Sequence, residues 1–186
     1  MNVLGISGSL RRDSHNTKLL RAAGELLPPF AELELWDWLK AVPPFDEDDE
    51  VEPAPAPVAA LRDAVAAADV LLFATPEYNH SVPGQLKNAV DWLSRPFVTS
   101  VLRGKPALVV GASTGAFGAV WAQAELRKVL AAAGARVVEA DVAVGHAPSK
   151  FDEQGRLVDE ELAEQLQEAL EVLLAEEPAR RLAIAV

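Results

Sequence analysis

The sequence predicts an α/β fold in which one parallel sheet is covered by helices on both faces. Five short apolar runs alternate with segments whose apolar residues recur at helical spacing, the pattern of repeated strand–helix units. Two of the runs, 70–74 and 106–110, are apolar throughout, as in strands buried on both faces. A chain of 186 residues can bury a large core, so we expect residues 1–186 to form a single domain.

The first strand is predicted at residues 2–6, and a helix is predicted over residues 16–27. The strand segment is a continuous apolar run, and the helix segment repeats leucine and alanine at helical spacing. Pro28 and Pro29 follow directly and cannot continue a helix.

The second strand is predicted at residues 31–36 and at the edge of the sheet. Leucine alternates with glutamate there, so only one face of the strand is apolar. A long loop, 37–57, follows; such loops are uncommon unless they bind something or form an interface. Its acidic run, 46–50, lacks calcium-loop spacing and is interpreted as solvated surface. Three nearby aromatic residues are expected in the core or at a subunit contact: Trp36, Trp38 and Phe45.

The rest of the chain continues the alternation of helices and strands. Gly134 ends the helix predicted over residues 119–133. The segment from the last predicted helix to Val186 has no clear pattern, and its structure is left open. The predicted helices are 58–68, 85–93, 119–133 and 160–174, and the predicted strands are 70–74, 106–110 and 136–144.

This alternation favours a flavodoxin-like three-layer sandwich with a five-stranded parallel sheet in the order 2-1-3-4-5. Ligands of such sheets bind at the carboxyl ends of the strands, where the strand order reverses. Loops rich in small or polar residues follow the first, third and fourth strands, at residues 7–17, 75–84 and 111–118. We therefore expect the three loops to form one ligand site.

The loop after the first strand has the chemistry of a phosphate site. Glycines allow close backbone approach, several hydroxyls can donate, and Arg11 can add a charge-assisted hydrogen bond. The loop matches neither the Walker A motif nor the Gly-x-Gly-x-x-Gly dinucleotide fingerprint, which favours a terminal phosphomonoester. The simpler alternative is an ordinary strand-to-helix turn in which Ser14 is only the helix N-cap.

Composition excludes several classes of partner and site. The formal net charge of −11 disfavours nucleic acid and anionic membranes, and no apolar run approaches the roughly 20 residues of a membrane helix. The chain has no cysteine, which removes disulfides and thiolate chemistry, and its histidines are too isolated to predict a metal site. We expect a cytoplasmic protein with no bound metal.

The other two loops suit a planar ring. Pro76 and Tyr78 supply a rigid turn and a flat face, while Ser113, Thr114 and Gly115 supply hydroxyls and close backbone approach. A phosphate end, a polar chain and a flat ring together describe FMN better than a sugar phosphate.

Three stretches resemble the NAD(P)H-dependent FMN reductase family, the flavodoxin-like group that includes quinone, azo-dye and chromate reductases. They are Gly8-Ser9-Leu10-Arg11 with Ser14 and Asn16, the run Pro76-Glu77-Tyr78-Asn79-His80-Ser81-Val82-Pro83-Gly84 with Lys87-Asn88-Ala89, and the glycine-rich loop 111–118. The resemblance implies three groups of binding residues. Ser9, Arg11, Ser14, Asn16 and Thr17 would bind the FMN phosphate; Pro76, Glu77, Tyr78 and Asn79 would line the isoalloxazine and ribityl chain; Ser113 and Gly115 would complete the pocket.

The resemblance also implies the reaction. We expect hydride transfer from NAD(P)H to bound FMN, then electron transfer to flavin, quinone or similar small acceptors by a ping-pong mechanism, in a homodimer or homotetramer. Such a reaction needs alignment of rings, so no residue is predicted to be catalytic. The alternative is a flavodoxin-type electron carrier without its own NAD(P)H reaction. Arg12 is a candidate for a 2′-phosphate of NADPH or a solvated surface residue. His15 could cap the helix or touch the phosphate, but we expect it to be exposed at the helix start.

Overall fold

A parallel sheet in the order β2-β1-β3-β4-β5 forms the centre of the structure, and β6 also pairs with β4. The computed structural model describes the chain from residue 1 to 184 and the side chains of residues 1–177. Each strand pair is parallel, as predicted, and the predicted strand order is confirmed. The strands are β1 (Asn2–Ser7), β2 (Glu32–Leu35), β3 (Val70–Thr75), β4 (Pro106–Ala112), β5 (Arg136–Val137) and β6 (Ala143–Val144).

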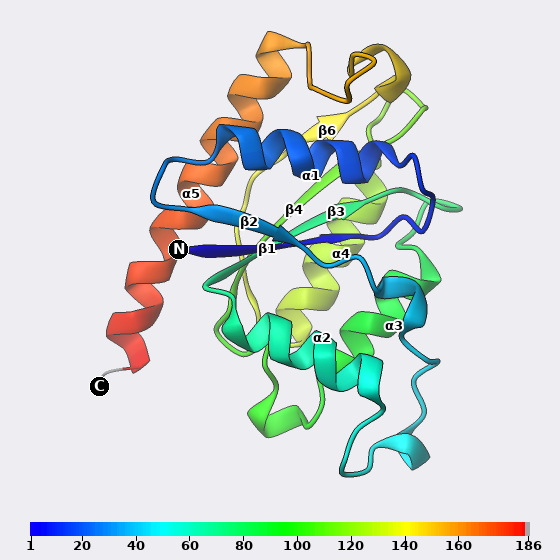
Figure 1. Cartoon of the computed structure of the whole chain (residues 1–186), viewed down its shortest axis with the longest axis vertical. Coiled ribbons are helices and arrows are strands. Elements are labelled where there is room, and N and C mark those ends of the chain that lie inside the picture. The colour runs from blue at the N-terminus through cyan, green and yellow to red at the C-terminus, as the bar shows by residue number, and fades with distance from the viewer. Residues whose placement is uncertain (185–186) are drawn as a thin grey trace.

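Helices cover both faces of this sheet (Figure 1). One face carries α1 (His15–Leu26) and α5 (Glu160–Ile184). The other face carries α2 (Ala56–Ala67), α3 (Gly84–Leu93) and α4 (Val120–Ala132). This is the flavodoxin-like three-layer arrangement. No helix of the described part is long and apolar enough to cross a membrane.

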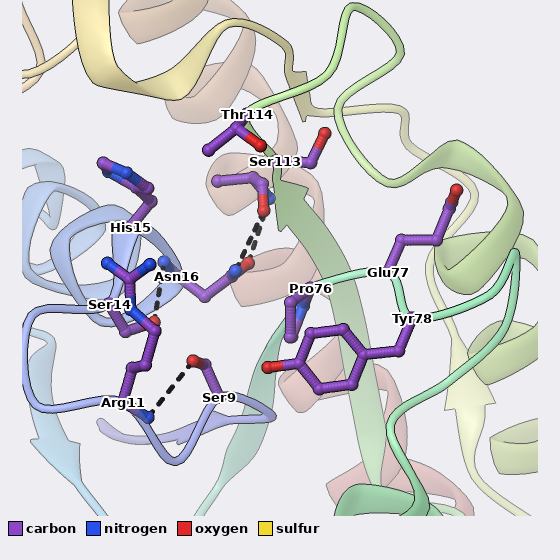
Figure 2. A pocket seen from close by; sticks show the side chains of 11 residues that line it. Ser9, Arg11, Ser14, His15, Asn16, Pro76, Glu77, Tyr78, Ser113 and Thr114 are labelled. Carbon is purple, nitrogen blue, oxygen red and sulfur yellow. Dashed lines mark hydrogen bonds between the residues drawn. The ribbon is translucent and has the colours of Figure 1, made fainter.

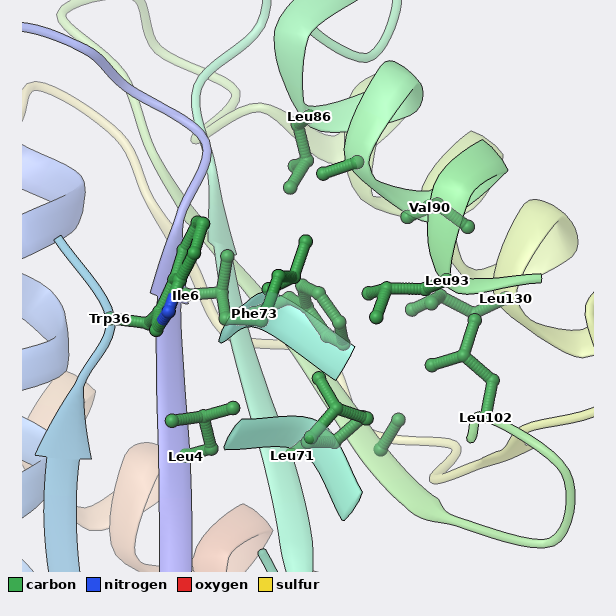
Figure 3. Packing of buried hydrophobic residues seen from close by; sticks show 14 of the residues in the cluster. Leu4, Ile6, Trp36, Leu71, Phe73, Leu86, Val90, Leu93, Leu102 and Leu130 are labelled. Atoms are coloured by element: carbon green, nitrogen blue, oxygen red, sulfur yellow. The ribbon is translucent and has the colours of Figure 1, made fainter. Parts of the chain in front are cut away.

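The continuous apolar strands supply two separate cores. Side chains of β3 alternate between the faces, so Leu71 and Phe73 join the core under α2, α3 and α4, while Leu72 joins the core under α1 and α5. Figure 3 shows the first of these cores, with Phe73 at its centre and Leu86 reaching down from α3. Burial on both faces is what the unbroken apolar pattern predicts.

The register of the central strands places three loops at one edge. Ser7 at the end of β1 pairs with Ala74, and Thr75 at the end of β3 pairs with Gly111. The loops after β1, β3 and β4 therefore start at the same level of the sheet. The strand order reverses between β1 and β3, which is where ligands of such sheets bind.

The prediction of one strand over residues 136–144 is wrong. Two short strands, β5 and β6, pair with β4 at either end of this stretch, and the residues between them leave the ladder. The guanidinium of Arg127 on α4 donates to the carbonyl of Ala140 and pairs with Asp141 at 2.9 Å. This contact with a helix side chain replaces the strand pairing that the apolar pattern predicts.

The helix predicted over residues 160–174 continues to Ile184, so most of the ambiguous tail is helical. Residues 185–186 lie outside the described residues. The long loop 37–57 contains two short 3₁₀ helices, Leu39–Ala41 and Glu47–Asp49, and its acidic run is tied to the body by Arg95, which pairs with Glu50 at 2.7 Å.

Candidate functional site

Three loops, one after each of β1, β3 and β4, meet around a cavity of about 160 Å³. We call them the first loop (residues 8–14), the second loop (residues 76–81) and the third loop (residues 113–118). Figure 2 shows most of the labelled side chains around one space, with the ring of Tyr78 across its lower side and Glu77 directed away from it. Convergence of the three loops was the central expectation for a ligand site, and the geometry places them together.

The first loop begins with a close approach between two segments. Gly8 donates its N–H to the carbonyl of Ala74 at 2.8 Å, and a Cβ at this position would lie 2.7 Å from a methyl of Leu86 and 3.2 Å from Pro76. A side chain at this position would displace Leu86 and press on Pro76, so glycine favours this close approach of the two loops. The Ser9 hydroxyl then accepts from the N–H of Arg11 at 3.4 Å, which turns the loop toward α1.

Ser14 is the N-cap of α1, as the simpler interpretation of the loop predicts. Its hydroxyl accepts from the N–H groups of Asn16 at 3.2 Å and Thr17 at 3.4 Å, and the residue is buried. A serine hydroxyl that accepts in this way still has its own proton to donate. The cap and a contact with a phosphate oxygen are therefore compatible.

Asn16 joins the first loop to the end of β4. Its carboxamide donates to the carbonyl of Ala112 at 2.9 Å and accepts from the N–H of the same residue at 2.9 Å. Asn16 is buried, so both hydrogen bonds are shielded from water. The residue lines the cavity and at the same time fixes the spacing between the first and third loops (Figure 2).

The second loop is a tight hairpin tied to α4. Tyr78 and Ser81 exchange both backbone hydrogen bonds at 3.1 Å, and the two residues between them, Asn79 and His80, have φ angles of 53° and 59°. Positive φ at both central positions is the geometry of a type I′ turn, which asparagine tolerates well. The carboxylate of Glu77 points away from the cavity and accepts from the N–H groups of Trp121 and Ala122 in the first turn of α4.

The third loop is held by β6 and by the segment after it. Ser113 donates its N–H to Val144 at 3.0 Å, and His146 donates its N–H to the carbonyl of Gly115 at 2.9 Å. A Cβ on Gly145 would lie 2.2 Å from the carbonyl oxygen of Ala116, so this position requires glycine. The hydroxyls of Ser113 and Thr114 therefore have a fixed backbone beneath them.

Most of the site residues proposed from the sequence lie at this cavity, and three do not. Its lining includes Ser9, Arg11, Ser14, Asn16, Pro76, Glu77, Tyr78 and Ser113. The Thr17 hydroxyl donates to Ser7 at 3.1 Å and lines a neighbouring cavity instead. Asn79 is exposed at the turn, and exposed Gly115 lies beyond the lining in the third loop.

His15 is the lining residue that the sequence interpretation placed wrongly. It is half-buried rather than exposed, because its ring stacks on Phe151 with the ring centres 6.1 Å apart. Its Nδ1 is buried and has no hydrogen-bond partner among the described residues. Burial, with added repulsion from Lys18 and Arg11, lowers the pKa of His15 below its usual 6.5. Phe151 lies far along the chain, so no local pattern predicts this contact.

The donors around the cavity suit a phosphate monoester. Arg11 brings a guanidinium, Ser9 and Ser14 bring hydroxyls, and the N-terminus of α1 adds partial positive charge. The nearby Asp13 is held by Lys18 at 2.9 Å, and that hydrogen bond lowers the pKa of Asp13.

The size of the cavity limits which part of FMN it can hold. Its volume of about 160 Å³ is below the roughly 300 Å³ at which complete ligand pockets begin. It could hold the phosphate end of FMN but not the whole cofactor. The donors that line the cavity therefore fit the phosphate end of FMN.

Comparison with known proteins gives one consistent family. The model of the family described as NADPH-dependent FMN reductase matches residues 1–149. The chain is 44% identical over 174 residues to an NAD(P)H-dependent FMN reductase of Pseudomonas aeruginosa, covering 93% of each chain. It is 38% identical over 168 residues to a 2-hydroxy-1,4-benzoquinone reductase of a Burkholderia species, covering 90% of this chain and 91% of the relative.

A solved structure agrees with the sequence matches. The flavoenzyme NAD(P)H:acceptor oxidoreductase FerB of Paracoccus denitrificans superimposes with a TM-score of 0.84 at 32% identity, over 96% of this chain and 98% of that one. The shared fold, the cavity at the carboxyl ends of the strands and the sequence matches over most of the chain all indicate the same family. The chain therefore belongs to the NADPH-dependent FMN reductase family, an enzyme family whose cofactors are FMN and NAD(P)H.

Proposed function

We propose that this enzyme takes hydride from NAD(P)H and passes the electrons to flavin, quinone or similar small acceptors by a ping-pong mechanism. The observation that supports it is the meeting of the three loops at a cavity whose outer rim is open at Tyr78, which is 51% exposed. Bound FMN supplies the redox chemistry, by accepting hydride from the nicotinamide and giving electrons to the acceptor. An open rim lets donor and acceptor use the same place in turn.

In this proposal the protein binds and orients the cofactor. The guanidinium of Arg11 neutralises charge on the phosphate, and the hydroxyls of Ser9 and Ser14 hydrogen-bond to it. Asn16 keeps the first and third loops at the correct distance. Pro76 and Tyr78 border the ring, and Ser113 lies beside the chain. No side chain of the cavity is assigned a catalytic proton transfer, because hydride transfer between stacked rings depends on alignment.

We propose that residues 1–186 act as one FMN-binding domain in the cytoplasm, assembled as a homodimer or homotetramer. The domain assignment is supported by α5, which packs into the same core as α1, β3 and β4. Assembly is supported by exposed aromatic side chains on the second and third loops and at the start of α4. We call Tyr78, His80, Phe117 and Trp121 the aromatic rim; Tyr78 lines the cavity, and the ring of Trp121 makes edge contacts with His80 at 4.9 Å and with Phe117 at 5.2 Å.

The visible spectrum of the purified protein tests the proposal. We expect flavin absorbance that bleaches within seconds of adding NADPH without oxygen and returns when a quinone is added. A yellow protein that stays oxidised under NADPH would favour a flavodoxin-type electron carrier. Initial rates with both substrates varied should give parallel double-reciprocal lines, and intersecting lines would contradict the ping-pong order.

A further inference from the structure

A second cavity, of about 320 Å³, lies on the other side of the first loop. Its walls come from the end of β1, the first loop, α1 and the segment that follows β2. Ser9 and Arg11 line both cavities, so one short stretch of chain separates them. The electron transfer proposed above uses the first cavity and leaves the second without a role.

The second cavity is strongly basic in a strongly acidic protein. Four cations from the first loop, α1 and the segment after β2 line it: Arg11, Arg12, Arg21 and Lys40. Asp37 is the only carboxylate among its described lining residues, which leaves a formal excess of three positive charges. The whole chain carries a formal net charge of −11, so this positive field is local. Cations that converge from three separate elements favour a ligand with several negative charges.

The cations of the second cavity are available to a ligand. Arg12, Arg21 and Lys40 are exposed, and within the described part of the chain none of them forms an ion pair. The guanidinium of Arg11 donates to the backbone carbonyl of Asp13 at 2.6 Å, which leaves further N–H groups for an anion on either side of the loop.

A hydroxyl donor and an apolar wall complete the second cavity. The Ser7 hydroxyl accepts from the N–H of Ser9 at 3.3 Å and from the hydroxyl of Thr17 at 3.1 Å, so its own proton remains to donate. Trp36 and Leu39, both buried, form part of the wall. Apolar groups beside the cations reduce dielectric screening and strengthen their attraction for an anion.

We propose that the second cavity binds a compact polyanion, of the pyrophosphate or tricarboxylate class, and that this anion opposes FMN binding across the first loop. The excess of positive charge matches such an anion better than a singly charged one, and guanidinium groups hydrogen-bond both phosphate and carboxylate oxygens. Because Arg11 lines both cavities, the FMN phosphate and the polyanion would compete for its guanidinium. Repulsion between two anions on either side of one loop acts in the same direction.

Isothermal titration calorimetry of the protein saturated with FMN tests the second cavity, because the first is then occupied. We expect one pyrophosphate or citrate to bind per chain about tenfold more tightly than sulfate, and the tighter of the two identifies the class of polyanion. Arg21→Gln with Lys40→Gln should weaken this binding about tenfold, since two exposed, charge-assisted contacts are lost. Neither residue lines the first cavity, so FMN affinity without polyanion should stay at the wild-type value.

Fluorescence titration of the apoprotein with FMN, at increasing concentrations of the polyanion, tests the opposition between the two ligands. The apparent dissociation constant of FMN should rise about fivefold and then level off, because both ligands can be bound at once. In Arg21→Gln with Lys40→Gln the same polyanion concentrations should change it little. A constant value in the wild type would overturn the opposition. A rise without a plateau, equal in wild type and variant, would show direct competition in the first cavity and overturn the proposal.

Arg103→Gln with Lys128→Gln is the matched control. Both residues are exposed, lie outside the linings of the two cavities and change the net charge equally, so this variant should bind the polyanion as the wild type does. Pyrophosphate and citrate that bind no more tightly than sulfate, or unchanged binding in Arg21→Gln with Lys40→Gln, would overturn the proposal. These measurements need no electron donor, so a protein that passes them and fails to oxidise NAD(P)H contradicts the proposed function alone.

Discussion

Asn16 holds two of the three loops together through both ends of its carboxamide. Asn16→Ala would leave the N–H and the carbonyl of Ala112 buried without these partners, since the two hydrogen bonds are lost together. We expect the free energy of unfolding of the apoprotein to fall by about 2–4 kcal/mol, measured by urea denaturation. FMN affinity should also fall, because the third loop loses its spacing from the first.

Asn88 provides the matched control for this prediction. Its carboxamide also bonds backbone at both ends, accepting from Phe45 at 2.6 Å and donating to Pro43 at 2.8 Å, but it lies away from the cavity. Asn88→Ala should destabilise the protein and leave the dissociation constant of FMN unchanged once the folded fraction is corrected for. Equal loss of FMN affinity in both variants would show that Asn16 acts only through stability.

His15 gives the apoprotein a pH-dependent stability. Its pKa is lowered in the folded state, chiefly by burial, so below the unfolded value of about 6.5 the unfolded chain binds more protons. The free energy of unfolding should therefore decrease as pH falls below about 6.5 and be insensitive to this residue above that pH. Urea denaturation at pH 5.5 and 7.5 measures the difference.

His15→Asn is the variant that isolates this effect, since asparagine does not titrate. The decrease between pH 7.5 and 5.5 should be smaller in the variant than in the wild type. An identical decrease in the two proteins would assign the pH dependence to other groups. Bound FMN should reduce the wild-type effect as well, because a phosphate dianion beside the ring favours its protonated form.

Residues whose roles depend on neighbours in the sequence could be predicted, and residues with distant partners could not. Ser14 as an N-cap and Arg11 as a loop cation follow from the first loop alone. The expectation that Asn16 binds the phosphate stays a prediction, and no local pattern indicates its hydrogen bonds to Ala112, 96 positions away. His15 was expected to be exposed because nothing local indicates that Phe151 covers it.

At the scale of elements, α4 depends on a carboxylate from another part of the chain. The helix begins after Ala119, which has a φ of 65° and no capping side chain, and Glu77 accepts from its first N–H groups. Glu77→Ala should lower the free energy of unfolding by about 1–2 kcal/mol and speed amide exchange in the first turn of α4. The second loop, released from α4, should bind the flavin ring less tightly.

Glu77→Gln is the conservative comparison. The amide oxygen can still accept from the two N–H groups, but the favourable interaction of a negative charge with the helix N-terminus is lost. We expect a loss of stability smaller than in Glu77→Ala and nearly unchanged exchange in α4. If both variants exchange like the wild type, the hydrogen bonds from Glu77 do not hold the start of the helix.

The alternation of elements could be predicted because each strand and helix has its own apolar period. The buried runs that became β3 and β4 were unambiguous, since they are apolar on both faces. The stretch 136–144 has the apolar content of a strand, but Arg127 binds its middle and divides it into β5 and β6. The length of α5 was also missed, because its residues after 174 follow no clear amphipathic pattern.

At the scale of the whole molecule, the acidic surface and the apolar rim of the cavity have opposite consequences. A net charge of −11 keeps copies of the chain apart, while exposed aromatic side chains beside the cavity favour burial against another surface. Phe117 is 64% exposed and its ring contacts only Trp121 among the aromatic groups of the described part. If a second copy covers the aromatic rim, it also covers the flavin ring.

Phe117→Glu should therefore shift the assembly toward monomer and weaken FMN binding, since it places a charge where an apolar contact is needed. Light scattering after size-exclusion chromatography measures the first effect, and fluorescence titration of FMN measures the second. Phe30→Glu is the control, because Phe30 is equally exposed at 64% but lies at the turn before β2, away from the cavity. A monomeric wild type would contradict the assembly, whereas a Phe117→Glu dimer with normal FMN affinity would place the subunit contact on another face. A partner copy at the aromatic rim would narrow the space above the flavin ring. In Phe117→Glu, dissociation to monomer and loss of FMN affinity should therefore occur over the same range of protein concentration.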